Sequence, residues 1–368
     1  MKAFDVSDVK QRNRSKVYDY IRQHELCSRT EIAKANGISG PTILKISGFL
    51  LDEGLVVEAG EHSETVGRKP QLLKSNPNRY FAIGALVEGA YVHAGLVNLN
   101  AELHSVLKEK TNNDLRSIMM DQLPRMITRL ITDSGLSKDR ILGAGIGLPC
   151  TYDTENHIIS NGPLVLVQGK MALTKMEEEL SRKCGLPIIV DNDANMQVYG
   201  EYHARKLQDT DLIYISIGTG LGAGIVLDGK LRRGSNYQCG EIGYMVFDEK
   251  HVADPQQAGW LEQIISIQTL NQKFEKLEQS NTAFMQFIAE KIAVAITNIV
   301  AVIDCNTICL GGVLADMLGE PLVEEVRATI RRLSTLEISV EGHSCPDPGI
   351  VGSATMIIQQ KLQVLFEK

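Results

Sequence analysis

Residues 187–195 read PIIVDNDAN and residues 215–227 read ISIGTGLGAGIVL, and these two stretches decide the fold. Each is an apolar run that leads directly into a polar or glycine-rich turn, which is typical of a buried strand. Around them, strand patterns alternate with helix patterns. The predicted elements are a hairpin over Tyr80–Leu99, helices over Asp114–Ser134 and Lys170–Cys184, and strands over Ile141–Leu148, Pro187–Val190 and Thr307–Leu310. This order indicates an α/β body, which we expect to have two lobes.

The composition is that of a folded protein of two or three domains. Of the 368 residues, 43% are hydrophobic and 23% are charged, so a packed core is expected. The sequence contains no run of about 18 apolar residues, and its first residues lack the apolar core of a signal peptide. Seven cysteines are scattered and never spaced as CxxC. We therefore expect a reduced, cytoplasmic protein with no membrane span and no disulfide framework.

Charge is distributed unevenly along the chain. The net charge is −7, but residues 1–79 carry 13 Lys and Arg against 10 Asp and Glu. One short segment near the start holds five basic side chains and a single acid; the five are Lys10, Arg12, Arg14, Lys16 and Arg22. A small basic head on an acidic body is typical of a DNA-binding module joined to a sensor or an enzyme. A solvated helix face would give the same charges.

The basic segment begins a pattern of three helices and two strands. The predicted helices cover about 6–25, 29–36 and 39–53, and the strands cover 55–58 and 71–74 with a polar loop between them. Ser28 and Glu31 have the spacing of a capping box, and Gly37 is a suitable stop for the second helix. Ser39 can cap the third helix, with Pro41 in its first turn. This order predicts a winged helix-turn-helix, although plain three-helix bundles also exist.

A winged head predicts where DNA would be contacted. The start of the third helix meets base edges in the major groove, so we expect Thr42 and Lys45 to contact bases and Ser39 to contact a phosphate. Arg68 and Lys69 on the wing are expected to enter a minor groove, whose negative potential attracts such side chains; the alternative for Arg68 is a phosphate contact. The first helix adds Arg12 and Arg14 to the predicted DNA-binding residues.

Several motifs then occur in one order along the body. They are LPIIVDNDAN, ISIGTGLGAGIVLDGKL, CGEIGYM, GWLEQIIS, ICLGGV and PGIVGSATM. Together they resemble the ROK family of sugar kinases and sugar-responsive repressors, and the head ending in GRKP resembles the repressor branch. The resemblance implies an actin-like, hexokinase-like fold of two lobes with a sugar cleft between them. The expected domains are a head over 1–78, one lobe over 79–195 to which a helix over 354–368 returns, and a second lobe over 196–353.

The kinase phosphate loop of this family has the form DIGGT, and this sequence departs from it. The matching residues are Leu86, Val87, Glu88, Gly89 and Ala90. Glu88 would place a negative charge where a triphosphate sits, and at 4 Å such repulsion is about 4 kcal/mol at an effective dielectric of 20. The glycines over 218–224 are intact, but a strand turn requires them in any case. We therefore expect no ATP cofactor and no enzymatic activity, with a ROK sugar kinase as the alternative.

The resemblance also implies the sugar site. Asn192 and Asp193 follow a buried strand, and in the kinases the matching Asp is the general base toward the sugar hydroxyl. Glu241 and Glu262 match two further sugar contacts, and Asn161 is expected to line the same cleft. Carboxylates and an amide that converge on a small site suit a polyol, because a hydrogen bond to a charged partner contributes about 1.5–3 kcal/mol. An isolated Asp or Glu is more often a solvated surface group.

A structural zinc of the family is not expected in this chain. The four positions of its ligands are Tyr244, Ala253, Pro255 and Trp260, and none of these is a usual zinc ligand. His251 lies nearby but is more simply a surface or packing residue. Trp260, with Phe247 and Tyr244, is expected to hold the loop by packing. Because Tyr244 replaces a residue that often touches sugar in the family, we include it among the ligand-binding residues.

These observations together predict a cytoplasmic, sugar-responsive repressor. The expected partners are operator DNA and a sugar or sugar derivative, and the expected assembly is a homodimer or a dimer of dimers. A repressor controlled by a protein partner is a second alternative. The apolar helix over Thr282–Cys305 is either core or a dimer face, and we favour core.

Overall fold

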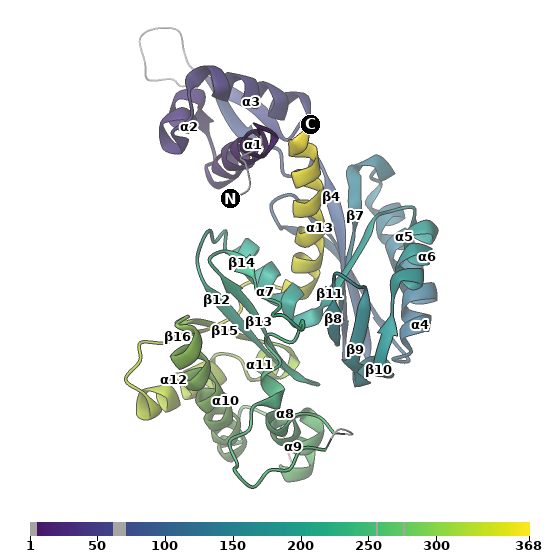
Figure 1. Ribbon diagram of the computed structural model, residues 1–368, viewed down its shortest axis with the longest axis vertical. Helices are drawn as coiled ribbons and strands as arrows, with labels where there is room; N and C mark the ends of the chain where they lie inside the picture. Colours follow the sequence, from purple (N-terminus) through teal and green to yellow (C-terminus); the bar gives the residue numbers. More distant parts are fainter. Residues whose placement is uncertain (1–5, 62–70, 255–256, 275–276) are drawn as a thin grey trace.

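The computed structural model describes residues 6–61, 71–254, 257–274 and 277–368. Its chain forms an N-terminal head and two α/β lobes, and a long C-terminal helix runs from the lobes to the head (Figure 1). The head consists of α1 (Val6–Gln23), α2 (Arg29–Asn36), α3 (Gly40–Asp52) and a small sheet. The strands of this sheet are β1 (Cys27–Ser28), β2 (Val56–Glu61) and β3 (Gln71–Ser75), in the order β1-β3-β2.

The short-range signals placed the head helices correctly. Ser28 and Glu31 form the predicted capping box, with the Ser28 hydroxyl accepting the Glu31 N–H. Gly37 ends α2 in the left-handed region, at φ 63°, where a side chain would be strained. Ser39 is the N-cap of α3, but its hydroxyl bonds Thr42 Oγ1 at 2.8 Å rather than a backbone N–H. In α1 the buried stripe contains Val17, Tyr18 and Ile21, whereas Tyr20 is only half-buried.

The first lobe is built on a five-stranded sheet in the order β11-β7-β4-β5-β6. Its strands are β4 (Phe81–Glu88), β5 (Tyr91–Asn98), β6 (Leu103–Lys110), β7 (Ile141–Leu148) and β11 (Ile188–Asn192). A side sheet holds β8 (Thr151–Asp153), β9 (Ile158–Gly162) and β10 (Val167–Ala172). The helices are α4 (Leu115–Ser117), α5 (Leu123–Ser134), α6 (Thr174–Cys184) and α7 (Asp193–Ala204). In Figure 1 the helices α4, α5 and α6 lie on the outer side of this lobe.

Two predicted helices of this lobe need correction. The predicted helix over Lys170–Cys184 begins only at Thr174, because Lys170–Ala172 pairs with β9 as the last part of β10. The predicted helix over Asp114–Ser134 is interrupted by a π-helical turn over Ile118–Gln122, which separates α4 from α5.

The second lobe is built on a sheet in the order β14-β13-β12-β15-β16. Its strands are β12 (Leu212–Ile217), β13 (Leu221–Leu227), β14 (Lys230–Leu231), β15 (Thr307–Gly311) and β16 (Ser339–Gly342). Its helices are α8 (Trp260–Ile265), α9 (Ile267–Lys273), α10 (Thr282–Ile303), α11 (Val313–Leu318) and α12 (Glu320–Leu333).

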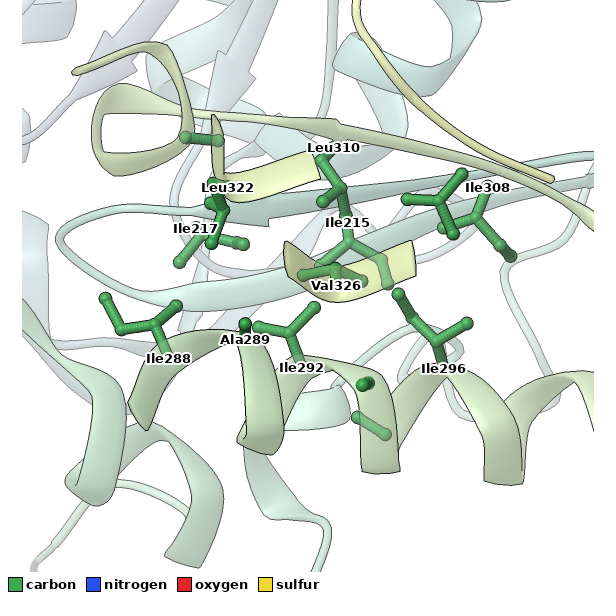
Figure 2. Close-up of a cluster of buried hydrophobic side chains, with 14 of the residues drawn as sticks. Ile215, Ile217, Ile288, Ala289, Ile292, Ile296, Ile308, Leu310, Leu322 and Val326 are labelled. Atoms are coloured by element: carbon green, nitrogen blue, oxygen red, sulfur yellow. The ribbon is translucent and has the colours of Figure 1, made fainter. Parts of the chain in front are cut away.

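Helix α10 is a core helix of this lobe, as predicted. It is long and apolar enough by composition to cross a membrane, but one face is packed inside the protein. Figure 2 shows Ile288, Ile292 and Ile296 of α10 facing Ile215 of β12 and Val326 of α12. All five side chains are fully buried. Buried apolar side chains of this size each stabilise the fold by about 1.5–3 kcal/mol.

Helix α13 (Pro348–Glu367) joins the lobes to the head. It packs on α7, β4 and β7, and its C-terminal end lies beside α1 and α3 (Figure 1). The crossing with α7 is close because both helices have a glycine there. A Cβ added at Gly352 would collide with the carbonyl oxygen of Met196, and one at Gly200 would collide with the carbonyl oxygen of Pro348. The two helices can therefore approach to backbone contact.

The far end of α13 completes the core of the head. Phe366 is 3% exposed and makes edge contacts with Tyr18 of α1 and Phe49 of α3, with ring centroids 5.8 and 6.4 Å apart. The Arg14 guanidinium lies 3.5 Å from the centre of the Phe49 ring and donates to the Phe366 carbonyl at 3.0 Å. Lys10 Nζ donates to the carbonyl of Lys368 at 2.7 Å. Head and body thus share one continuous apolar cluster.

Candidate functional site

A polar cavity of about 850 Å³, including its open mouth, lies between the two lobes. It is formed by the ends of β4 and β11, the start of α7, the β12–β13 turn, the loop at Gly240 and α8. Five of the six predicted ligand-binding residues line it: Asn161, Asn192, Asp193, Glu241 and Glu262. The structure therefore brings together side chains that are as much as 101 positions apart in the sequence.

Asp193 is the first residue of α7, directly after β11. The Ala194 N–H donates to its Oδ1 at 2.9 Å. Burial raises the pKa of Asp193 to about 7, and the charges of Glu88 and Glu241 add to the rise. A carboxylate that titrates near neutrality is a strong acceptor for a ligand hydroxyl once it is ionised.

Asn192 positions this junction, since both ends of its side chain are engaged within the protein. Its Oδ1 caps α7 by accepting the Asn195 N–H at 3.1 Å, and its Nδ2 donates to the Cys150 carbonyl at 3.0 Å. Asp191, at the end of β11, also stabilises this junction. Its Oδ2 accepts Arg233 Nε at 2.9 Å, so the buried charge is paired.

The two glutamates are each held by one hydrogen bond, from the other lobe at Glu241 and from within the second lobe at Glu262. The Thr151 hydroxyl donates to Glu241 Oε1 at 2.9 Å, and the Leu221 N–H donates to Glu262 Oε2 at 3.2 Å. Burial raises the pKa of both carboxyls, and the charge of Glu241 adds to the rise at Glu262. These bonds orient the carboxylates and leave each with one oxygen that can accept from a ligand.

Sequence reasoning did not name every side chain that lines this cavity, and Asn195 and Tyr237 are two that it missed. Asn195 is 6% exposed, and its Oδ1 has no hydrogen-bond partner within the described residues. Its Nδ2 donates to Asp191 Oδ1 at 2.9 Å, so the amide orientation follows from a paired carboxylate. Tyr237 is the second missed residue. The last position of DNDAN could have indicated Asn195, because it lies one helical turn after Asn192.

Tyr244 is not among the residues that line the cavity, although burial and the charges of Glu241 and Glu262 raise the pKa of its phenol, so its role in ligand binding stays a prediction. Its side chain is 54% exposed, at the end of a short 3-10 turn over Ile242–Tyr244. Of the aromatic residues expected to hold this loop, Phe247 and Trp260 do make an edge contact at 5.7 Å. Pro255 lies outside the described residues. Within the described part of the chain, no group of three or more His, Cys, Asp or Glu side chains could hold a metal ion.

The two hairpin turns that flank the kinase phosphate site in the resemblance meet each other here. A Cβ added at Gly89, in the β4–β5 turn, would lie 3.1 Å from Thr219 Cγ2 in the β12–β13 turn. Glu88, at the end of β4, lines the ligand cavity beside these turns. The Gly218 N–H donates to the Gly220 carbonyl at 3.0 Å, as expected of a strand turn.

The predicted DNA-binding residues separate into three groups. Ser39 and Lys45 are exposed at the start of α3 and Thr42 is half-buried between them, so these three share one surface of the head. Arg68 and Lys69 lie outside the described residues.

Arg12 and Arg14 are placed differently from the prediction. Arg12 is exposed but lines a groove between the head and the body, opposite Tyr202 and Lys206. Arg14 is 9% exposed and bonds Phe366, as described above. It lies on the buried stripe of α1 with Val17, so its charge serves the contact with α13 rather than an open surface.

Comparison with known proteins agrees with this architecture. A sequence profile of the ROK family matches residues 87–359. The "Xylose repressor" of Caldicellulosiruptor bescii is 27% identical over 394 aligned residues, which cover 96% of this chain and 97% of that protein.

Two solved structures share the fold. The first, a ROK family transcriptional regulator described as a homologue of E. coli MLC protein, has a TM-score of 0.78 at 22% identity, covering 97% of this chain and 98% of that one. A Streptomyces griseus ROK glucokinase in complex with glucose and AMPPNP has a TM-score of 0.64 at 20% identity, covering 76% of this chain and 99% of the kinase. These likenesses confirm the predicted fold class, a winged helix-turn-helix head on a two-lobed, actin-like α/β body.

Proposed function

The chain belongs to the ROK family, and on that premise we propose that it is a sugar-responsive transcriptional repressor. The relative named xylose repressor matches it over nearly its whole length, head included. In this proposal the head, over 1–78, binds operator DNA through Ser39, Thr42 and Lys45, with Arg68 and Lys69 on the wing. A sugar binds between the lobes, over 79–195 with the returning α13 and over 196–353. The protein acts in the cytoplasm.

One observation carries the proposal: the cavity and the head are connected by two rigid helices. Helix α7 begins at Asp193 in the cavity. It crosses α13 at Gly200 and Gly352 in backbone contact. The other end of α13 places Phe366 in the core of the head. A ligand that moves the start of α7 therefore also moves the element on which the head rests.

This geometry supports a coupling between ligand and DNA rather than two independent sites. A ligand that binds one arrangement of the lobes better shifts the chain toward it, and the typical coupling is about 1–3 kcal/mol. We propose that two or four copies assemble, because two heads would then meet half-sites about 34–36 Å apart or a multiple of that. Ligand-driven tilting of α13 would change the spacing of the heads.

We also propose that the chain has no kinase activity. Glu88 replaces a glycine of the family's phosphate loop, and Thr219 lies against the neighbouring turn. Phosphoryl transfer depends on positioned groups that neutralise phosphate charge, and an acid at that place opposes it. Sustained ATP consumption with any sugar of the panel below would contradict this part of the proposal.

The test is a mobility-shift assay on the DNA upstream of the chain's own gene, titrated with a panel of sugars. We expect a shifted complex whose midpoint changes 5- to 150-fold with one sugar, which corresponds to about 1–3 kcal/mol of coupling. The Asp193→Ala variant should bind DNA as the parent does and lose the response. An Asp193→Ala chain with an unaltered dose-response would remove Asp193 from the site. Intact DNA binding with no response to any sugar would instead favour control by a protein partner.

A further inference from the structure

We propose that Glu88 makes the cavity selective for uncharged polyhydroxy ligands, so that an unphosphorylated sugar, and not its phosphate ester, is the effector. This inference rests on the proposed function and deepens it. It concerns a residue that has been considered above only for its effect on a nucleotide triphosphate. Three observations carry it: the charges of the cavity wall, the state of its backbone donors, and the surroundings of Glu88.

The described wall of the cavity carries charge of one sign. Four carboxylates line it: Glu88, Asp193, Glu241 and Glu262. No Lys, Arg or His is present among the described lining residues. The carboxylates also lie close enough to act on one another, because the charges of Glu88 and Glu241 raise the pKa of Asp193. A phosphate ester carries up to two negative charges at neutral pH, so it would enter with repulsion from the wall and with no cation to pair.

Backbone N–H groups could bind an anion without a cation, but three of those at this wall are already used. At the start of α7, the Ala194 N–H bonds Asp193 and the Asn195 N–H bonds Asn192. In the β12–β13 turn, the Leu221 N–H bonds Glu262. A phosphate could take these donors only by displacing carboxylates or the cap that hold the site together.

The charge of Glu88 itself is weakly compensated. Lys108 and His343 are the cations that act on it, and Asp316 and Asp347 act on it with the opposite sign. His343 is bonded to Asp316 at 2.7 Å. Lys108 Nζ lies 4.5 Å from the centre of the Tyr91 ring. Glu88 lines both the ligand cavity and a smaller neighbouring cavity, which Asp316, His343 and Asp347 also line. On the side of the ligand cavity, no cation is present among the described lining residues to pair with it.

The side chains of the cavity wall are instead suited to a ligand that donates hydrogen bonds. Asp193, Glu241 and Glu262 each have an acceptor oxygen to offer, and the buried Oδ1 of Asn195 has no partner among the described residues. A buried acceptor without a partner destabilises the unliganded protein, and a ligand hydroxyl that donates to it would remove that cost. A sugar has several hydroxyls and no charge. The acceptors thus favour a ligand with hydroxyl groups, and Glu88 disfavours a ligand with negative charge. Both effects select an uncharged sugar.

The test is isothermal titration calorimetry of the full chain with xylose, glucose and their phosphate esters. The parent should bind one neutral sugar at least 100-fold more tightly than its phosphate. Glu88→Gln should reduce the ratio of the two affinities at least tenfold. The main change should be tighter binding of the phosphate ester, because the substitution removes the charge and keeps the shape of the side chain. Glu337→Gln, the same change at an exposed position, should leave the ratio as in the parent.

Two results would overturn the inference and leave the proposed function standing: a phosphate ester that binds the parent as tightly as its sugar, or a Glu88→Gln ratio equal to the parent's. Because the parent's ratio needs no variant, the inference stays testable even if Glu88→Gln does not fold. If no sugar and no phosphate binds a chain that still shifts DNA, the sugar-effector proposal itself fails, and this inference fails with it.

Discussion

Replacing Asp193 by Asn should stabilise the unliganded protein while abolishing its response to sugar. The side chain keeps its shape, and an Asn Oδ1 can still accept the Ala194 N–H that Asp193 accepts at 2.9 Å. What the substitution removes is a carboxylate held among Glu88 and Glu241 in a buried cavity. Binding sites are commonly strained in this way for function.

The size and the sign of the effect follow from the pKa. Asp193 titrates at about 7 in the folded chain against an ordinary value of 3.8. A carboxyl whose pKa is raised on folding costs nothing below the lower value, and it destabilises the folded state progressively as the pH rises toward the higher one. Each unit of pKa corresponds to about 1.4 kcal/mol, so the full cost reaches about 4 kcal/mol above pH 7. Between pH 5 and pH 8 the gain from Asn should grow by about 2.5 kcal/mol.

Urea unfolding of the parent and of Asp193→Asn at pH 5, 6, 7 and 8 measures this gain. Asp121→Asn, the same change at an exposed aspartate, supplies the control and should show no trend with pH. The reasoning is refuted if Asp193→Asn is no more stable than the parent at pH 8, or if its advantage is the same at every pH. A variant that is stabilised and yet still responds to sugar would show that Asp193 is buried for another reason.

Three further changes test the remaining parts of the structure. Lys45→Ala should weaken operator binding by about 1–3 kcal/mol and relax the preference at one base pair, which mobility shifts on single-base operator variants would detect; equal affinities would remove Lys45 from the DNA surface. Phe366→Ala should lower the free energy of unfolding by about 3–5 kcal/mol, because it removes the contact with Tyr18 and Phe49. Amide hydrogen exchange should become faster in α1, while the affinity for sugar stays as in the parent. Unchanged exchange in α1 would contradict the role of α13 in the core of the head. Gly352→Ala should push α13 away from Met196, lowering stability by about 1–3 kcal/mol and weakening the effect of sugar on DNA binding in the titrated shift assay; a full response would show that the α7–α13 crossing carries no signal.

Local signals in the sequence predicted those parts of the fold that local interactions determine. The strand over Ile141–Leu148 has the predicted bounds, because its apolar residues are buried on both faces and it needs no pattern from a partner. The cap residues Ser28 and Gly37 act within a few positions of themselves. The prediction of a helix at Lys170–Ala172 was wrong, because these residues form a strand by pairing with β9. Local periodicity in the sequence does not show such a pairing.

The site was predicted in outline for a different reason. Asn192, Asp193, Glu241 and Glu262 line one cavity, as the family resemblance implied. Arg14 failed because counting charges does not show on which face of a helix a charge lies, and its partner Phe366 is 352 positions away. Tyr244 was placed by its position in a motif whose metal ligands this chain lacks, and it is not among the residues that line the cavity. Asn195 was missed because its importance depends on an unpartnered atom, which only coordinates reveal.

The burial of Phe366 in the head means that the N-terminal segment is not an independent module. A fragment of residues 1–78 would leave the rings of Tyr18 and Phe49 facing water where they now contact Phe366. Fusing this head to a different ligand-binding domain would require the C-terminal part of α13 as well, as a second segment that is not contiguous with the head in the sequence. The two ends of the chain therefore share one hydrophobic core, and a chimera made from two relatives would need both ends from the same parent.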